Sequence, residues 1–198
     1  MQPKTVYTIG HSNHDAAAFL DLLRGQGVEA VADIRSQPFS RRYPHFRKSA
    51  LVRLLAEAGI EYVFLGRELG ARRDEAECYV DGVAEYDRVA RLPAFRSGVE
   101  RVVRGAERFR VALMCAERDP LQCHRSILVA PALRRAGLEV AHILAGGQVE
   151  SHEQLEERLL EQTGTAPDLF ERAPLEHAYR SKAREMAYRR NRKEEGKA

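Results

Sequence analysis

Apolar positions along the chain fall into two alternating patterns. Short apolar-rich runs are typical of buried strands, and they occupy residues 5–9, 28–34, 60–65, 109–114 and 138–144. Between these runs, apolar residues recur three and four positions apart, as on one face of a helix. Glycines at positions 25, 59 and 137 mark where three of these helices should end. The pattern therefore predicts strands that alternate with helices.

Strands that alternate with helices through short turns predict an α/β fold with a mostly parallel sheet of about five strands and helices on both faces. The chain has 198 residues, 44% of them hydrophobic, which is enough for one core. We expect a single three-layer domain over residues 1–166, followed by a basic C-terminal extension over residues 167–198. From Glu171 onward, nine Lys and Arg residues stand against five Asp and Glu residues.

Composition also bears on the compartment. No apolar run approaches the ~18 residues needed to cross a bilayer, and the N-terminus lacks a signal-peptide pattern. Three cysteines cannot all pair, which argues against a disulfide framework. These features predict a cytoplasmic protein without a membrane partner.

The most reactive side chains gather after the fourth run, between Cys115 and Arg125. Asp119 is followed directly by Pro120 and, three residues after the Asp, by Gln122, which is a typical pattern for the start of a helix. The pattern predicts a helix from Asp119 to Ala136 with a kink at Pro131. Cys123 and His124 would then lie in the first turn. Free N–H groups at a helix N-terminus favour an anion or a thiolate, so this turn is a candidate anion site.

Ligands of parallel sheets bind outside the carboxyl ends of the strands. This rule groups three strand ends, His11-Ser12, Asp33-Ile34-Arg35 and Cys115-Ala116-Glu117, into one cleft. The candidate catalytic residues are Glu117 as general acid or base, His11 as proton carrier and Cys115 as nucleophile. The candidate residues for substrate and anion binding are Ser12, Asp33, Arg35, Cys123, His124 and Arg125.

Each candidate also has a structural interpretation. Both cysteines could be inert core residues, and Ser12 could cap the helix that follows it. Asp33 and Arg35 could form an ion pair, and Glu117 could pair with an arginine.

Several familiar motifs are absent. The sequence has no C-x-x-C pair, no paired-His spacing, no G-x-G-x-x-G after the first strand and no G-x-x-x-x-G-K motif. Position 121, where a phosphatase or rhodanese loop that starts at Cys115 would need an arginine, is a leucine. We therefore expect no metal site, no cofactor and no dinucleotide or NTP site of those kinds.

The motifs do resemble a known family. They are Thr8-Ile9-Gly10-His11-Ser12, Asp33-Ile34-Arg35 with Pro38 and Ser40, Met114-Cys115-Ala116-Glu117, and Pro120 followed by Cys123-His124-Arg125. Together they resemble the prokaryotic family catalogued as domain of unknown function 488, over roughly residues 5–160. The resemblance implies one compact α/β domain with these motifs grouped, and it assigns no reaction. One departure is that the family often shows Leu-Gly-Gly where this chain has Leu69-Gly70-Ala71.

Three functional hypotheses follow. The first is a small enzyme acting on a phosphate-bearing substrate, with an anionic small molecule, nucleotide or nucleic acid as its partner. The second is a non-catalytic nucleic-acid-binding module, because aromatic and basic residues alternate in the loop 38–46 and the C-terminal segment is basic. The third is sulfur transfer or redox chemistry through Cys115 or Cys123. The sequence does not determine the oligomeric state.

Overall fold

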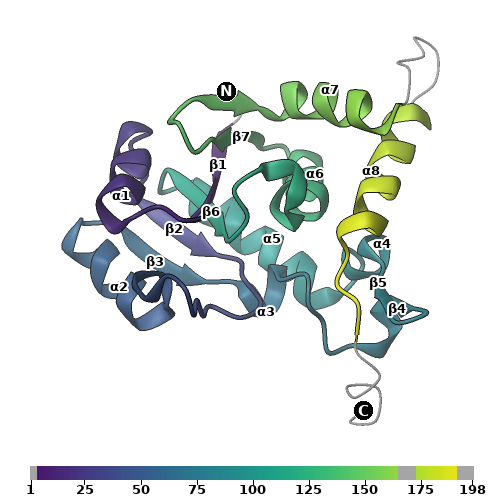
Figure 1. The fold of residues 1–198 in the computed structure, drawn as a ribbon, viewed down its shortest axis with the longest axis horizontal. Helices are drawn as coiled ribbons and strands as arrows, with labels where there is room; N and C mark the ends of the chain where they lie inside the picture. The colour runs from purple at the N-terminus through teal and green to yellow at the C-terminus, as the bar shows by residue number, and fades with distance from the viewer. Residues whose placement is uncertain (1–3, 165–172, 191–198) are drawn as a thin grey trace.

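The computed structural model describes residues 4–164 and 173–190, and its centre is a six-stranded sheet in the order β3-β2-β6-β1-β7-β8 (Figure 1). The strands are β1 Thr5–Gly10, β2 Ala30–Asp33, β3 Glu61–Phe64, β6 Val111–Cys115, β7 Glu139–Ile143 and β8 Val149–Ser151. Five strands are parallel, as predicted, and β8 pairs antiparallel with β7. The sequence did not predict β8, because three residues of mixed polarity are too short to show a period.

Eight α-helices accompany the sheet in the described part of the chain. They are α1 Ala16–Gly25, α2 Lys48–Glu57, α3 Gly66–Leu69, α4 Tyr86–Val89, α5 Pro93–Ala106, α6 Ala130–Arg135, α7 His152–Thr163 and α8 Ala173–Met186. Shorter elements are the 3-10 turns η1 Pro44–Phe46, η2 Ala76–Cys78 and η3 Pro120–Gln122, the π-helical turn η4 Arg125–Val129, and a hairpin of β4 Tyr79–Val80 and β5 Val83–Ala84.

Side chains of β6 alternate between two cores, which confirms the three-layer arrangement. Ala112 and Met114 pack in one buried cluster with residues of α1 and α2. Leu113 and Cys115 point to the other face and pack in a cluster with residues of α3 to α8. Because successive strand residues face opposite sides, one apolar strand covers both cores.

Two helix starts show why local sequence was informative. Asp15 accepts a hydrogen bond from the Ala18 N–H and begins α1. Ser151 and Gln154 form a capping box that begins α7, and their spacing is typical of one. Each side chain satisfies an N–H that the helix itself leaves free.

The expected helix from Asp119 to Ala136 is wrong at its start, because the continuous helical segment covers residues 124–135. Asp119 does cap a turn, accepting from the Leu121 N–H, but that turn is a 3-10 turn of three residues. Cys123 then adopts an extended conformation, with φ −137° and ψ 138°, and a π-helical turn precedes α6. Pro131 has no N–H for the carbonyl of Ile127, and the wider turn lies just before it. Cys123 and His124 therefore lie where a second helical segment, residues 124–135, begins, and not in the first turn of a helix that starts at Asp119.

The basic C-terminal segment contains a packed helix. Helix α8 lies against α7 and beside α4 (Figure 1), and its Ala178 is fully buried. Arg190 donates to the carbonyls of Arg73 and Asp74, so one of its basic side chains is held within the molecule. The boundary at residue 166 stays a prediction, and residues 165–172 and 191–198 lie outside the described residues.

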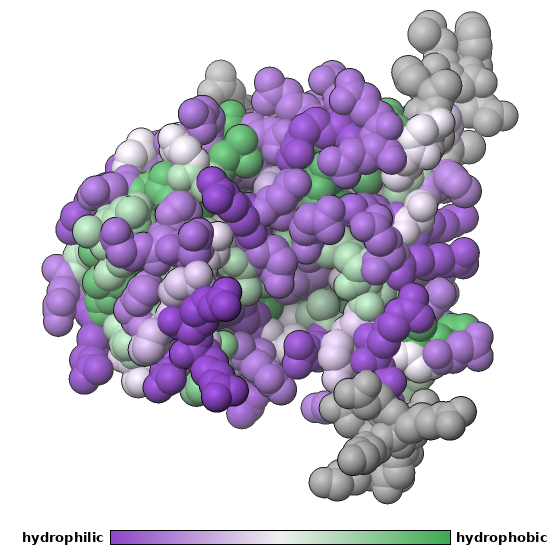
Figure 2. Space-filling model, viewed as in Figure 1, coloured by the Kyte–Doolittle hydropathy of each residue, from purple (hydrophilic) through white to green (hydrophobic). Residues whose placement is uncertain are grey.

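The visible surface in Figure 2 is mainly hydrophilic, and apolar residues form small, separate groups on it. Among the described residues, no helix has the length and hydrophobicity to cross a bilayer.

Candidate functional site

The loops that follow β1 and β6 lie against each other at the carboxyl edge of the sheet. The N–H of His11 donates to the carbonyl of Cys115 at 2.8 Å, and the N–H of Ser12 donates to that of Ala116 at 2.9 Å. A Cβ atom on Gly10 would come 1.9 Å from the carbonyl oxygen of Glu117. Glycine at this position therefore permits a close approach of two backbones.

A cavity of about 350 Å³ opens at the ends of β2 and β6. Five of the nine predicted site residues line it: Arg35, Cys115, Glu117, Cys123 and His124. The other four, His11, Ser12, Asp33 and Arg125, are described but are not among its lining residues. The strand-end rule thus brought together about half of the candidate set.

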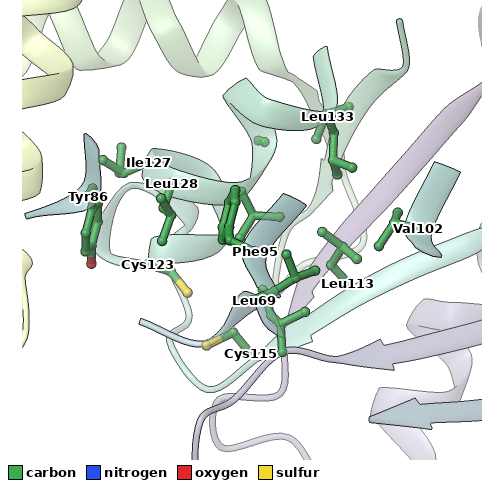
Figure 3. Close-up of a cluster of buried hydrophobic side chains, with 14 of the residues drawn as sticks. Leu69, Tyr86, Phe95, Val102, Leu113, Cys115, Cys123, Ile127, Leu128 and Leu133 are labelled. Atoms are coloured by element: carbon green, nitrogen blue, oxygen red, sulfur yellow. The ribbon is translucent and has the colours of Figure 1, made fainter. Parts of the chain in front are cut away.

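Two thiols, a carboxylate and an imidazole converge on the cavity floor. Glu117 Oε2 lies 3.2 Å from Cys115 Sγ and 3.4 Å from Cys123 Sγ. His124 Nδ1 lies 3.7 Å from Cys115 Sγ and 3.8 Å from Cys123 Sγ. Figure 3 shows both cysteines at one margin of the buried apolar cluster. They are only 4% and 1% exposed, so both thiols are nearly out of reach of solvent.

The four groups perturb one another electrostatically. The hydrogen bond with Cys123, together with burial, raises the pKa of Cys115 well above its ordinary value. Burial alone would raise the pKa of Cys123, but the bond from Cys115 and the charge of Arg125 hold it well below the ordinary value. Burial opposes a charge on His124 as well, yet its bond to Cys123 raises its pKa. The arrangement therefore favours negative charge on Cys123.

Glu117 is the solvent-exposed member of this cluster. Partial burial of its carboxyl group, followed by the charge of Cys123, raises its pKa above the ordinary value. A carboxyl group with a raised pKa, open to a cavity, has the properties of a general acid or base.

Arg125 holds the loop that carries Glu117 through hydrogen bonds to its backbone. Its guanidinium donates to the carbonyls of Glu117 at 2.6 Å and Arg118 at 3.2 Å, and its side chain is fully buried. Two of its nitrogens are thus committed to the backbone. The predicted role of Arg125 in holding an anion stays untested, and its contacts show that it also fixes the position of Glu117.

Asp33 and Arg35 form a buried ion pair. Arg35 Nε and Nη2 donate to the two carboxylate oxygens at 2.9 and 2.6 Å, and Nη1 donates to the carbonyl of Phe46. Tyr62 donates to the same carboxylate. This pair ties the end of β2 to η1, which is the structural interpretation of these residues. Arg35 nevertheless reaches the cavity wall, so its binding role remains a prediction.

His11 and Ser12 turn away from the cavity floor. The ring of His11 stacks on Phe46 with 4.3 Å between centroids, and burial, followed by the charge of Arg35, lowers its pKa to about 4. The Ser12 hydroxyl donates to the Asn13 side chain. The backbones of His11 and Ser12 meet the loop of Glu117, whereas the His11 ring packs on Phe46 in the opposite core.

The rim of the cavity includes residues outside the set of nine predicted site residues. The Arg72 guanidinium lies 4.7 Å from the ring centroid of Tyr188, and Phe39 is 63% exposed. Tyr86 and Ala71 also line the wall. Two of these residues had a signal in the sequence: Phe39 lies in the loop 38–46 that suggested base stacking, and Ala71 stands where the family often has its second glycine. Arg72, Tyr86 and Tyr188 had no such signal and reach the cavity only through folding.

The loop 38–46, which was proposed to stack on nucleic acid, is partly buried in the core. Phe46 is fully buried, and His45 contacts the carbonyl of His14 at 2.8 Å. Phe39, with the guanidinium of Arg47 4.8 Å from its ring centroid, remains accessible. One aromatic residue of the loop is therefore unavailable to a base.

The fold and the site define a class: a three-layer α/β protein with a polar pocket at the carboxyl ends of parallel strands. The chain belongs to the family described as domain of unknown function DUF488, whose model matches residues 15–131. No curated protein and no solved structure matched the chain.

Proposed function

We propose that the cavity is the active site of a small enzyme that acts on a phosphate-bearing substrate of nucleotide size, with Glu117 as the group that moves a proton. The observation that carries this proposal is the position of Glu117. It is exposed to the cavity, and its inner oxygen contacts two buried thiols. A surface carboxylate would have its ordinary acidity, whereas burial against sulfur favours the protonated form.

The rim supports the choice of substrate class. Phe39 offers an exposed aromatic face on which a base can stack, and Arg72 offers an exposed guanidinium for a phosphate. The guanidiniums of Arg35 and Arg125 are held by Asp33 and by the backbone. Arg72 is therefore the better candidate for the phosphate than the two arginines that the sequence indicated.

The test is to incubate the full chain with ribo- and deoxyribonucleoside phosphates and short oligonucleotides, and to follow products by chromatography and mass spectrometry. We expect the wild type to convert one class. Glu117→Gln should lower turnover by roughly 10²-fold or more, the usual contribution of a positioned acid or base, and keep substrate binding. Glu57→Gln, which changes an exposed carboxylate on α2, serves as the matched control.

Unchanged turnover in Glu117→Gln would remove the assignment of this residue. Equal affinity for the substrate in Arg72→Gln and the wild type would remove the phosphate role of Arg72. Salt-dependent binding of oligonucleotides without any conversion would instead favour the non-catalytic nucleic-acid module.

A further inference from the structure

Three side chains of the kinds that bind metal ions meet at the cavity floor. The Sγ atoms of Cys115 and Cys123 and the Nδ1 atom of His124 all lie within 4.8 Å of one another. Cys115 is the last residue of β6, while Cys123 and His124 lie between η3 and η4. Seven residues separate the two cysteines, so no recognised zinc spacing predicts the group.

His124 is oriented as metal-binding histidines usually are. Its Nε2 lies 3.2 Å from the carbonyl oxygen of Ile34, which can only accept a hydrogen bond. The neutral ring therefore carries its proton on Nε2 and turns the lone pair of Nδ1 towards both sulfurs. A backbone carbonyl on the far nitrogen is the common outer partner of a histidine ligand.

We propose that Cys115, Cys123 and His124 bind a zinc ion. In a tetrahedral zinc site, neighbouring sulfur and nitrogen ligands lie about 3.5–3.8 Å apart. The two separations between sulfur and Nδ1 are 3.7 and 3.8 Å, longer than the contacts that the thiols make with Glu117. Two thiolates and an imidazole suit zinc among the common divalent metals, and burial of both sulfurs suits a ligand better than a nucleophile.

The fourth coordination position would face the cavity. Three protein ligands are typical of catalytic zinc sites, which leave one position to solvent or substrate. Glu117 borders that position, because its Oε2 contacts both sulfurs. The zinc inference does not depend on the proposed function, because the three ligands could hold a structural ion in a pocket without activity.

The experiment measures metal on the untagged full chain. Protein purified from zinc-supplemented medium without chelators should contain one zinc per chain by elemental analysis. The metal-free chain loaded with Co²⁺ should show a thiolate-to-cobalt charge-transfer band and intense visible bands of a tetrahedral site. Less than one tenth of an equivalent of zinc, together with no thiolate band, would overturn the proposal.

Variants identify the ligands. We expect each of three ligand variants to weaken zinc binding: Cys115→Ser, Cys123→Ser and His124→Gln. Competition with a chromogenic chelator measures the zinc affinity. The loss should exceed the roughly 10–100-fold that follows when a residue hydrogen-bonded to a ligand is removed. Cys78→Ser is the matched control, because Cys78 is the third buried cysteine and lies outside the group. Zinc affinity in Cys123→Ser equal to that of Cys78→Ser would contradict the assignment. If the ligand variants do not fold, the wild-type stoichiometry and cobalt spectrum decide.

Two results separate this inference from the proposed function. Glu117→Gln should keep one equivalent of zinc while losing turnover, because Glu117 is not one of the three ligands. Inactive wild-type protein with full zinc would refute the function alone. Rapid alkylation of Cys115 or Cys123 in a wild type that takes up no zinc would refute the metal site and favour thiol chemistry.

Discussion

Gly10 is the residue at which the chain of β1 comes closest to the loop of Glu117. Besides the carbonyl oxygen of Glu117, a Cβ atom there would meet Arg125 Nη1 at 3.1 Å. The same carbonyl accepts the short hydrogen bond from Arg125. One missing side chain thus allows a buried arginine and a strand end to hold the candidate acid in place.

Gly10→Ala should therefore destabilise the protein and displace Glu117. The added methyl group meets backbone, which cannot rotate away, and overpacking of this kind costs about 1–3 kcal/mol. Denaturant unfolding measures the loss. Gly25→Ala is the control, because a Cβ at the end of α1 meets nothing within 4 Å and alanine favours the helix. Equal stability of the two variants would mean that the loop moves freely.

At the level of elements, a buried chain of polar groups joins β1, β7, α7 and α8. The Thr8 hydroxyl contacts His142 Nδ1 at 2.8 Å, and His142 Nε2 contacts His152 Nδ1 at 3.0 Å. His152 Nε2 contacts the Tyr179 hydroxyl at 2.8 Å, and that hydroxyl donates to Glu156. Each group can donate once along this chain when both histidines are neutral. A second proton on His152 would place its Nδ1–H against the Nε2–H of His142.

Acid should consequently destabilise the protein. Burial, followed by the proximity of His152, lowers the pKa of His142 well below its ordinary value. Burial, followed by the charge of Arg134, lowers the pKa of His152 to about 4. The unfolded chain takes up both protons below about pH 6.5. The folded chain takes up the proton of His152 only near pH 4, and that of His142 only well below its ordinary pKa.

Stability from these groups should thus be level above about pH 6.5 and fall steadily towards pH 4. For His152 alone the loss is about 3 kcal/mol, at 1.36 kcal/mol for each pH unit between the two values. Urea unfolding across this range measures it. His152→Gln should be less stable at pH 7.5 yet lose less on acidification. An unchanged slope in that variant would show that other groups govern the acid response.

In the whole molecule, α8 helps to enclose the candidate site, although this helix lies beyond the residues that the family model matches. The match ends at residue 131, whereas Met186 and Tyr188 line the cavity. Ala178 and Ala187 belong to the same buried cluster as Cys115 and Cys123. The C-terminal helix is therefore both a part of the core and a wall of the site.

A chain that ends at residue 166, the predicted domain boundary, tests this arrangement. Loss of α8 should lower the free energy of unfolding by at least about 3 kcal/mol, roughly the value of one or two buried apolar side chains. Ala178→Leu should weaken the full chain through overpacking, whereas His177→Leu, at the exposed neighbouring position, should not. A truncated chain as stable as the full one would support the boundary at residue 166.

The pattern of apolar positions predicted the five parallel strands, because each is a short run rich in apolar residues, and it predicted the longer helices, because each shows its own period. The caps at Asp15 and Ser151 are local features, because each joins residues only three apart. The order of the strands in the sheet could not be predicted from the apolar pattern of the strands or of the helices. It depends on which elements pack together, and β6 lies between β1 and β2 although about eighty residues separate β2 from β6.

The site was decided only partly by sequence. Order along the chain placed Arg35, Cys115 and Glu117 near one edge, because all of them follow parallel strands. Side-chain direction needed the tertiary structure: His11 stacks on Phe46 in the opposite core, while extended backbone at Cys123 brings its sulfur to Cys115. Two thiols converge on one imidazole nitrogen because Cys123 is extended and because His124 contacts the carbonyl of Ile34, and residue spacing indicates neither.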